Sequence, residues 1–338
     1  MTAPTSTAPK CSTQHLAAAL LRALLLAAVL ATGGCTSAPS LITAATESPT
    51  PAALTVNHDG LPFRVWYKPR TTDATRGAIL LLHGRTWSSR PDFDLQVDGE
   101  PASLMDGLTA LGFDTYALDA RGYGETPRDP SGWLTPHKAR DDALAIVRWL
   151  KQRPGTQPLY LFGWSYGSLV AQLVVQTEPE LLNGWIAFGY PLRDGSATTP
   201  PAVASAAAPP RRPTTAAAAA EDFIVPGTIS PATIDAFVAQ ALATDPVRTD
   251  WRELEQWRDL DPTLIDRPTL LIEGALDPIA VDAYQAQLFT AIPHSDKRWV
   301  VLPHADHAGF LETSRAEFLK VIDAFTSPAR TPKPRVAP

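Results

Sequence analysis

The pentapeptide Gly163-Trp164-Ser165-Tyr166-Gly167 constrains the fold of this 338-residue chain more than any other segment. It follows the apolar run Leu159–Phe162 and precedes apolar residues at helical spacing, which predicts a strand, a sharp turn at Ser165 and a helix. Glycines on both sides of the serine allow the strand and the helix to approach each other closely. A Gly-x-Ser-x-Gly pentapeptide alone is a weak signal, and this setting makes it a strong one.

Short apolar runs alternate with helical patterns along most of the chain, which is typical of an α/β fold with a mostly parallel sheet covered by helices on both faces. Ala78–Leu82 is apolar throughout, as expected for a strand buried on both faces. Thr135 followed by Pro136 predicts the start of a helix. The other predicted strands are Phe63–Tyr67, Phe113–Leu118, Leu159–Phe162, Trp185–Phe188, Thr269–Ile272 and Trp299–Leu302, and further helices are predicted at Ser168–Gln176 and from Ala316 to Phe325.

Residues 193–266 interrupt this alternation and are predicted to form an insertion between strands. Thr199–Ala220 contains five prolines and ten alanines, which excludes a continuous strand or helix there. Two helices are predicted after it, over Pro231–Leu242 and Pro246–Leu260. We therefore expect an irregular first half and a helical second half.

Residues 1–35 have the features of an export signal. Leu16–Ala31 is apolar apart from Arg22, no acidic residue precedes Cys35, and the run is shorter than the roughly 20 residues that span a bilayer. The segment ends in Thr32-Gly33-Gly34-Cys35, which resembles a bacterial lipoprotein signal, although Thr32 stands where that signal usually carries Leu. We expect an exported protein of the cell envelope, anchored to a membrane through a lipid on Cys35. An ordinary secretory signal, giving a periplasmic or secreted protein, and an uncleaved anchor are the alternatives.

Composition places the folded domain at residues 54–326, between a flexible tether of residues 36–53 and a disordered tail of residues 327–338. Cys11 and Cys35 are the only cysteines, so no disulfide is expected in the folded domain. The net charge of −6 argues against a nucleic-acid partner. No metal-binding or dinucleotide-binding motif occurs, so we expect no metal and no cofactor, and no obligate protein partner is evident.

A serine hydroxyl becomes a nucleophile when a histidine base and an orienting acid assist it. Asp277 is the preferred acid because it follows the predicted strand Thr269–Ile272, where functional loops leave an α/β sheet. Asp194, after the preceding strand, is the competing acid. His304 and His307 both follow the last predicted strand and are the candidate bases. The chain thus carries a serine, an acid and a histidine in the order that such a site needs.

Attack by the serine creates an oxyanion, which two backbone N–H groups stabilise in enzymes of this chemistry. The amide of Tyr166, directly after the serine, is one predicted donor. The second is the amide of Arg85, in a loop where Gly84 permits a tight turn after a central strand. Trp87 and Trp164 flank this loop and the serine, and we hypothesise that they wall an apolar substrate pocket.

Several segments together resemble the α/β-hydrolase superfamily over about residues 55–326. The matching segments are Leu80-Leu81-Leu82-His83-Gly84, Leu118-Asp119-Ala120-Arg121-Gly122-Tyr123-Gly124, the Ser165 pentapeptide, Asp277 and His307. The resemblance implies a Ser165-Asp277-His307 triad, because His307 stands five residues before Glu312 and just before the last helix, as the catalytic histidine does in that family.

The same resemblance assigns roles to two further regions. It implies that Asp119 and Arg121 connect loops and are mainly structural. It also places residues 193–266 where the family carries its lid, although the Ala- and Pro-rich half is not a recognisable lid type. His304 is then expected to line the cleft.

The favoured activity is hydrolysis of a carboxylic ester in a small-molecule substrate, through an acyl-enzyme on Ser165 and without a cofactor. A serine aminopeptidase is the main alternative, and it predicts an acidic cluster in the insertion that holds a free amino group; Glu253, Glu255 and Asp259 are the candidates. A non-catalytic binding protein on the same fold is a third hypothesis, although such proteins usually lose members of the triad.

Overall fold

The computed structural model describes residues 49–191 and 208–327 of the chain. In this part the chain forms an eight-stranded sheet in the order β1-β2-β4-β3-β6-β7-β9-β10. β2 pairs antiparallel with β1 and with β4, and the remaining neighbours are parallel, which confirms the predicted mostly parallel sheet. The strands are β1 (Ala52–His58), β2 (Leu61–Lys68), β3 (Ala78–Leu82), β4 (Asp114–Leu118), β6 (Leu159–Trp164), β7 (Gly184–Phe188), β9 (Thr269–Gly274) and β10 (Lys297–Leu302).

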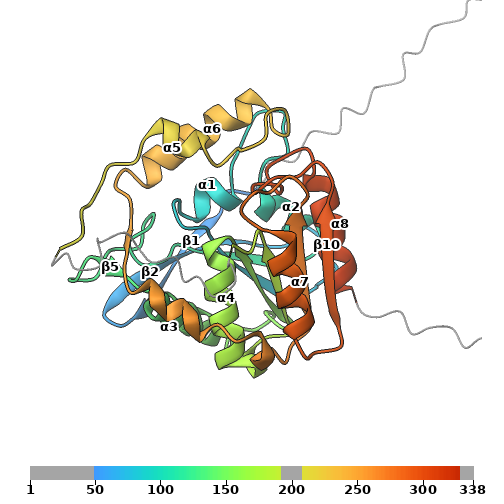
Figure 1. Ribbon diagram of the computed structural model, residues 1–338. Coiled ribbons are helices and arrows are strands. Elements are labelled where there is room, and N and C mark those ends of the chain that lie inside the picture. Colours follow the sequence, from blue (N-terminus) through green and yellow to red (C-terminus); the bar gives the residue numbers. More distant parts are fainter. Residues whose placement is uncertain (1–48, 192–207, 328–338) are drawn as a thin grey trace, which may run out of the picture. The chain divides into compact units, whose positions relative to one another are not determined.

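Helices cover both faces of this sheet (Figure 1). One face carries α3 (Pro136–Lys151), α4 (Tyr166–Thr177) and α7 (Asp282–Ala291), and the other carries α1 (Ser89–Phe93), α2 (Leu104–Ala110) and α8 (Arg315–Thr326). Side chains of β3 alternate between the two sides: Leu80 and Leu82 join the core under α3 and α4, and Ile79 and Leu81 join the core under α2 and α8. Both faces of this strand are therefore buried, as its apolar sequence predicted.

The start of α3 is the one that the sequence predicted. Thr135 precedes the helix in extended conformation, its hydroxyl accepts a hydrogen bond of 3.2 Å from the amide of Lys138, and Pro136 occupies the first helical position. The hydroxyl satisfies one of the amides that a helix leaves unpaired at its start, and proline removes another.

An antiparallel hairpin at the edge of the sheet was not fully predicted. β1 and β2 are joined by Asp59 and Gly60, whose φ angles of 51° and 72° are those of a two-residue hairpin turn. β1 begins at Ala52, two residues inside the predicted tether, and only Val56 of this strand is buried. The strand is hard to recognise because so few of its side chains reach the core.

The insertion contains the predicted α6 (Pro231–Thr244), preceded by the short helix α5 (Ala216–Ala220). The predicted helix Pro246–Leu260 is wrong. Instead, the two-residue strand β8 (Asp250–Trp251) pairs with β5 (Trp133–Leu134), and 3-10 helices follow at η3 (Leu254–Asp259) and η4 (Pro262–Leu264); a further one, η1 (Pro179–Leu181), follows α4.

Tertiary contacts explain this departure from the helical pattern. Trp251 packs edge-on against Tyr166, with ring centroids 5.4 Å apart, and its Nε1 donates a hydrogen bond of 2.7 Å to the Tyr123 hydroxyl. Glu253 has a left-handed backbone with φ 55°, which a helix does not allow. The contacts of one tryptophan with the domain therefore outweigh local helix propensity.

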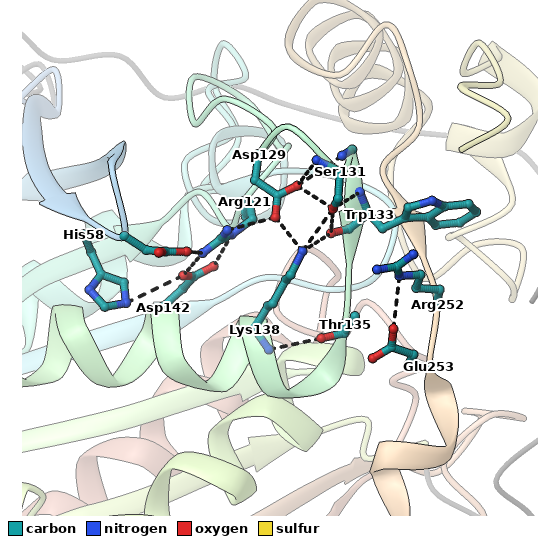
Figure 2. A network of polar contacts seen from close by, with 12 residues as sticks. His58, Arg121, Asp129, Ser131, Trp133, Thr135, Lys138, Asp142, Arg252 and Glu253 are labelled. Carbon is teal, nitrogen blue, oxygen red and sulfur yellow. Dashed lines mark hydrogen bonds and ion pairs between the residues drawn. The ribbon is translucent and has the colours of Figure 1, made fainter. Parts of the chain in front are cut away.

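Arg121 connects three parts of the domain, as predicted (Figure 2). Its guanidinium lies 2.6 Å from the Asp142 carboxylate on α3, and 3.0 Å from both Asp129 and Asp59. Lys138 also contacts Asp129, at 2.5 Å. Arg121 thus fastens the loop after β4 to α3 and to the hairpin turn at Asp59.

Several predictions fall outside residues 49–191 and 208–327. These are the export signal with Cys35, the competing acid Asp194, nearly all of the tether and the tail beyond Ser327. Among the residues that are described, no helix has both the length and the apolar composition needed to cross a bilayer.

Candidate functional site

Ser165 occupies the sharp turn that the pentapeptide predicted. β6 runs to Trp164, and α4 begins at Tyr166, so the serine alone joins strand and helix with φ 53° and ψ −122°. A Cβ atom at Gly163 would collide with the backbone of Gly167, and one at Gly167 would collide with the carbonyl oxygens of Leu82 and His83. Both glycines are therefore required by close backbone packing around the serine.

Asp277 and His307 form a hydrogen-bonded pair. The distance between Oδ2 of Asp277 and Nδ1 of His307 is 2.7 Å, and the aspartate side chain is fully buried. The other oxygen, Oδ1, accepts hydrogen bonds from the amides of Ile279, at 2.8 Å, and Ala280, at 3.2 Å. Because an ionised carboxylate only accepts hydrogen bonds, Nδ1 is the donor of this hydrogen bond, and in the neutral ring the lone pair is therefore on Nε2.

Two neighbours fix the position of the His307 ring. A Cβ atom at Gly189 would lie 2.9 Å from the imidazole, so only glycine leaves room for the ring there. On the other side, Nε1 of Trp164 donates a hydrogen bond of 2.6 Å to the His307 carbonyl, and the two rings lie 5.5 Å apart. Trp164 therefore contacts both the backbone and the ring of His307, while Gly189 and Asp277 contact the ring alone.

One cavity of about 210 Å³ brings most of the predicted site residues together. Ser165 and His307 both line it, and Asp277 lies behind His307. Trp87 and Trp164 form part of its wall, as hypothesised, although both are also packed in the core. Among residues 49–191 and 208–327, the lining comprises Gly84, Arg85, Thr86, Trp87, Trp164, Ser165, Tyr166, Pro191, Asp222, Ile279 and His307.

The two predicted oxyanion donors, Arg85 and Tyr166, also line this cavity. Tyr166 is the first residue of α4, where an amide has no acceptor within the helix and the helix dipole favours negative charge. The loop at Arg85 is held by a hydrogen bond from the Tyr123 hydroxyl to the Arg85 carbonyl. The Arg85 guanidinium lies over the Tyr166 ring, 5.1 Å from its centroid, so the two residues share one wall of the cavity.

The other histidines near the site have different surroundings. His304 has φ 64°, is exposed and does not line the cavity, which corrects the expectation that it lines the cleft. His83 is buried, and its Nε2 accepts a hydrogen bond of 3.1 Å from the Ala120 amide, while Nδ1 lies 2.8 Å from the Gly84 carbonyl. Burial lowers the pKa of His83 to about 4, so it is a neutral structural residue beside the site.

The acidic cluster predicted for an aminopeptidase does not reach this cavity. Glu253 lies 3.2 Å from Arg252, Asp259 contacts His137 at 2.8 Å, and the side chain of Asp259 is 60% exposed. Glu255 is exposed as well. These three carboxylates belong to a solvated surface, where short charged pairs are common.

Sequence reasoning missed an acid that lines the cavity. Asp222 follows α5 in the insertion, and its Oδ2 accepts a hydrogen bond of 2.6 Å from Nε1 of Trp87. Burial raises the pKa of Asp222 to about 6. No sequence pattern marks this residue, because it reaches the site only through long-range packing of the insertion on the domain.

A second missed residue, Asp306, connects the insertion to the loop that carries His307. Its Oδ2 accepts hydrogen bonds of 2.9 Å from the amides of both Ile224 and Val225, and its Oδ1 accepts one of 2.8 Å from the Ala308 amide. These hydrogen bonds hold the insertion against the loop of His307. They begin at Ile224, two residues after Asp222, so they also fix the position of Asp222.

Comparison with known proteins places the chain among hydrolases. The family model described as serine aminopeptidase, S33, matches residues 73–314, well over half of the chain. Lysophosphatidylserine lipase ABHD12 of Danio rerio is 32% identical over 111 residues, which are 33% of this chain and 26% of that protein. The Gallus gallus protein of the same name is 30% identical over 138 residues, covering 39% of this chain and 33% of the relative. The chain thus matches about a quarter to a third of the length of these relatives.

Solved structures share the fold at lower sequence identity. A soluble variant of monoglyceride lipase from Saccharomyces cerevisiae has a TM-score of 0.65 and 19% identity, with coverage of 83% of this chain and 96% of that one. A hydrolase from Pseudomonas aeruginosa has a TM-score of 0.59 and 22% identity, with coverage of 82% and 98%. These matches confirm the α/β-hydrolase fold predicted from the sequence.

Proposed function

Because the chain belongs to the serine aminopeptidase S33 family of the α/β-hydrolase superfamily, we propose that it hydrolyses carboxylic esters through an acyl-enzyme on Ser165. The observation that carries this proposal is the joint placement of Ser165 and His307 on one cavity, with Asp277 hydrogen-bonded to the far side of the imidazole. A serine becomes an activated nucleophile when such a base takes its proton, and the shared cavity supports this role of His307.

The proposed reaction has two steps. In the first, Nε2 of His307 takes the proton of the Ser165 hydroxyl while Oγ attacks the ester carbonyl; His307 then passes the proton to the departing alcohol, leaving an ester on Ser165. In the second, His307 deprotonates a water that attacks this ester, and it then returns the proton to Oγ of Ser165 as the bond between Oγ and the acyl carbon breaks and the acid is released. Asp277 keeps Nδ1 protonated and stabilises the imidazolium in both steps.

The amides of Tyr166 and Arg85 are the proposed oxyanion donors in both steps. Each such donor contributes about 2.7–4 kcal/mol of transition-state stabilisation in enzymes where one has been removed. The placement of Tyr166 at the start of α4 adds the helix dipole to this stabilisation.

Ester hydrolysis is favoured over the two alternatives by separate observations. The relatives above are named as lipases, and Trp87 and Trp164 give the cavity an aromatic wall. The carboxylates predicted for an aminopeptidase, Glu253, Glu255 and Asp259, do not line the cavity, although the insertion places Asp222 on it. A purely binding role would not require the buried Asp277–His307 pair beside a strained serine.

A pair of substrates with the same acyl group tests the bond type. The purified protein is expected to hydrolyse p-nitrophenyl butyrate and to leave both butyryl p-nitroanilide and alanine p-nitroanilide nearly untouched. Release of the chromophore gives kcat/KM for each. Efficient cleavage of the alanine anilide with little cleavage of the ester would replace the esterase proposal by the aminopeptidase alternative.

A further inference from the structure

A second cavity, of about 220 Å³, is distinct from the one that contains Ser165. It is lined by residues 100–102, by the start of α6 and by residues 311–316, and the two cavities share no lining residue. A single water needs roughly 15 Å³ by the same measure, so this space accommodates a small organic molecule. Its wall combines apolar and titratable side chains, a composition typical of small-molecule sites.

Glu100 brings a negative charge to this second cavity. Its carboxylate accepts hydrogen bonds from the Ser230 hydroxyl, at 2.7 and 2.8 Å, and from the Thr233 hydroxyl, at 2.6 Å. These hydrogen bonds lower the pKa of Glu100, so the group is ionised at neutral pH. Both hydroxyls belong to the start of α6, which therefore fixes the position of the carboxylate.

Arg315, the first residue of α8, brings a positive charge to the same cavity. Its Nη2 donates a hydrogen bond to the Ser103 carbonyl, and its Nε has no hydrogen-bond partner among the described residues. Asp106 attracts the guanidinium electrostatically, but no carboxylate in residues 49–191 and 208–327 forms an ion pair with it. Burial lowers the pKa of Arg315, although the guanidinium remains charged at neutral pH. Arg315 is therefore available to bind an anionic group.

Glu312, the other acid on this cavity, carries no charge at neutral pH. Its side chain is buried, and its Oε2 accepts a hydrogen bond of 3.0 Å from the Asp306 amide. Burial and the neighbouring Asp306 carboxylate raise the pKa of Glu312 to about 9. The charged side chains that line the second cavity are therefore one carboxylate, Glu100, and one guanidinium, Arg315.

The two charges stay apart because each has partners of its own, hydroxyls of α6 for Glu100 and the Ser103 carbonyl for Arg315. A ligand with both an ammonium and a carboxylate group pairs with each of them, and charge-assisted hydrogen bonds of this kind are strong. The positive end of the α8 dipole also favours an anionic group next to Arg315. Ile229 and Leu311 provide an apolar surface for the rest of the ligand.

We propose that the second cavity binds an α-amino acid with an apolar side chain, its carboxylate at Arg315 and its ammonium group at Glu100. This site is separate from Ser165, and binding there does not depend on the proposed reaction. The lining joins the insertion to the segment before α8, where the Thr313 amide donates a hydrogen bond of 2.9 Å to the Thr228 carbonyl. A bound amino acid is therefore expected to hold the insertion more firmly on the domain.

Calorimetric titration of the full-length protein with leucine, methionine and phenylalanine tests the proposal. At least one of the three is expected to bind and to raise the Tm as its concentration increases, because a ligand that binds only the folded state stabilises it. For the tightest of them, the amide removes the carboxylate charge and the N-acetyl derivative removes the ammonium charge. Each analogue is expected to bind about 10- to 100-fold more weakly, the usual effect of losing a hydrogen bond to a charged group.

Variants of the two charged residues assign these effects to the cavity. Arg315→Gln should abolish the advantage of the amino acid over its amide, and Glu100→Gln should abolish its advantage over the N-acetyl derivative. Lys320→Gln and Glu317→Gln are the matched controls, because they remove the same charges from exposed positions of α8, and both should bind like the wild-type protein. Thermal melts show which variants fold, and Arg315→Lys, which keeps the charge, should retain part of the preference for the carboxylate.

Binding at this cavity is expected to be independent of Ser165. Protein whose Ser165 has been blocked by a fluorophosphonate should bind the amino acid with the same Kd, which distinguishes this site from the cavity of the proposed reaction. Loss of binding after this modification, equal binding of the amino acid and either analogue, or unchanged binding in both Arg315→Gln and Glu100→Gln would overturn the proposal, as would the absence of binding by all three amino acids. Ester hydrolysis is measured separately with p-nitrophenyl butyrate, so failure of either proposal is recognised without the other.

Discussion

Replacing His307 with alanine is expected to lower kcat/KM for a neutral ester by about 10⁴- to 10⁶-fold, as removal of the base does in other serine hydrolases. His307 lies on the same cavity as Ser165, and Asp277 fixes the proton on its Nδ1. Without the imidazole nothing takes the proton of Ser165 during attack. Initial rates with p-nitrophenyl butyrate, measured over a range of enzyme concentrations, give this loss directly.

Two further variants separate the roles around this histidine. Asp277→Asn should keep the geometry but favour the wrong tautomer of His307, with a loss of about 10⁴-fold in kcat. His304→Ala is the matched control, because His304 stands three residues away, is exposed and does not line the cavity. Loss of activity in His304→Ala together with retention in His307→Ala would reverse the assignment of the base.

The second large effect is expected on stability. Replacing Arg121 with methionine should reduce the free energy of unfolding by about 3–5 kcal/mol, because it leaves the buried Asp142 carboxylate with only the His58 imidazole nearby, at 4.0 Å. The Asp142 side chain is 1% exposed and lies 2.6 Å from the guanidinium (Figure 2). In a domain of this size the change corresponds to a fall in Tm on the order of 10 °C, measurable by calorimetry.

Partners of Arg121 provide the controls for this stability prediction. The Asp59 side chain is 64% exposed, so Asp59→Asn should change the free energy of unfolding by about 1 kcal/mol or less. The double variant Arg121→Met, Asp142→Leu replaces the buried charges by apolar groups and should recover much of the loss. A double variant as unstable as Arg121→Met alone would show that the charge on Asp142 is not the cause.

Features fixed by local sequence were predictable. The strand that ends before Ser165, the two glycines around it and the cap of α3 at Thr135 each depend on residues within a few positions of one another. Asp277 and His307 were predictable from their order after Ser165 in the chain and from their positions after predicted strands. Loops at the carboxyl ends of parallel strands meet at one edge of the sheet, which brings these two residues together. These residues lie where the sequence predicted them.

Features created by long-range packing were not predictable in the same way. The segment Pro246–Leu260 has a helical pattern, but the contacts of Trp251 with Tyr166 and Tyr123 impose a different backbone. Asp222 reaches the cavity through the docking of the insertion on the loop of His307, a contact that no local pattern encodes.

The hairpin turn at Asp59 and Gly60, in contrast, did carry a local signal, since Asp-Gly between two strands is typical of such turns.

Labelling with a fluorophosphonate probe, followed by peptide mass spectrometry, tests the central claim most directly. The probe reacts with a serine only where a base and an oxyanion site activate it. We expect one covalent adduct, on the peptide that contains Ser165, and its loss in the Ser165→Ala variant. No adduct on the folded protein, or an adduct that persists after Ser165→Ala, would contradict the assignment of Ser165 as the nucleophile.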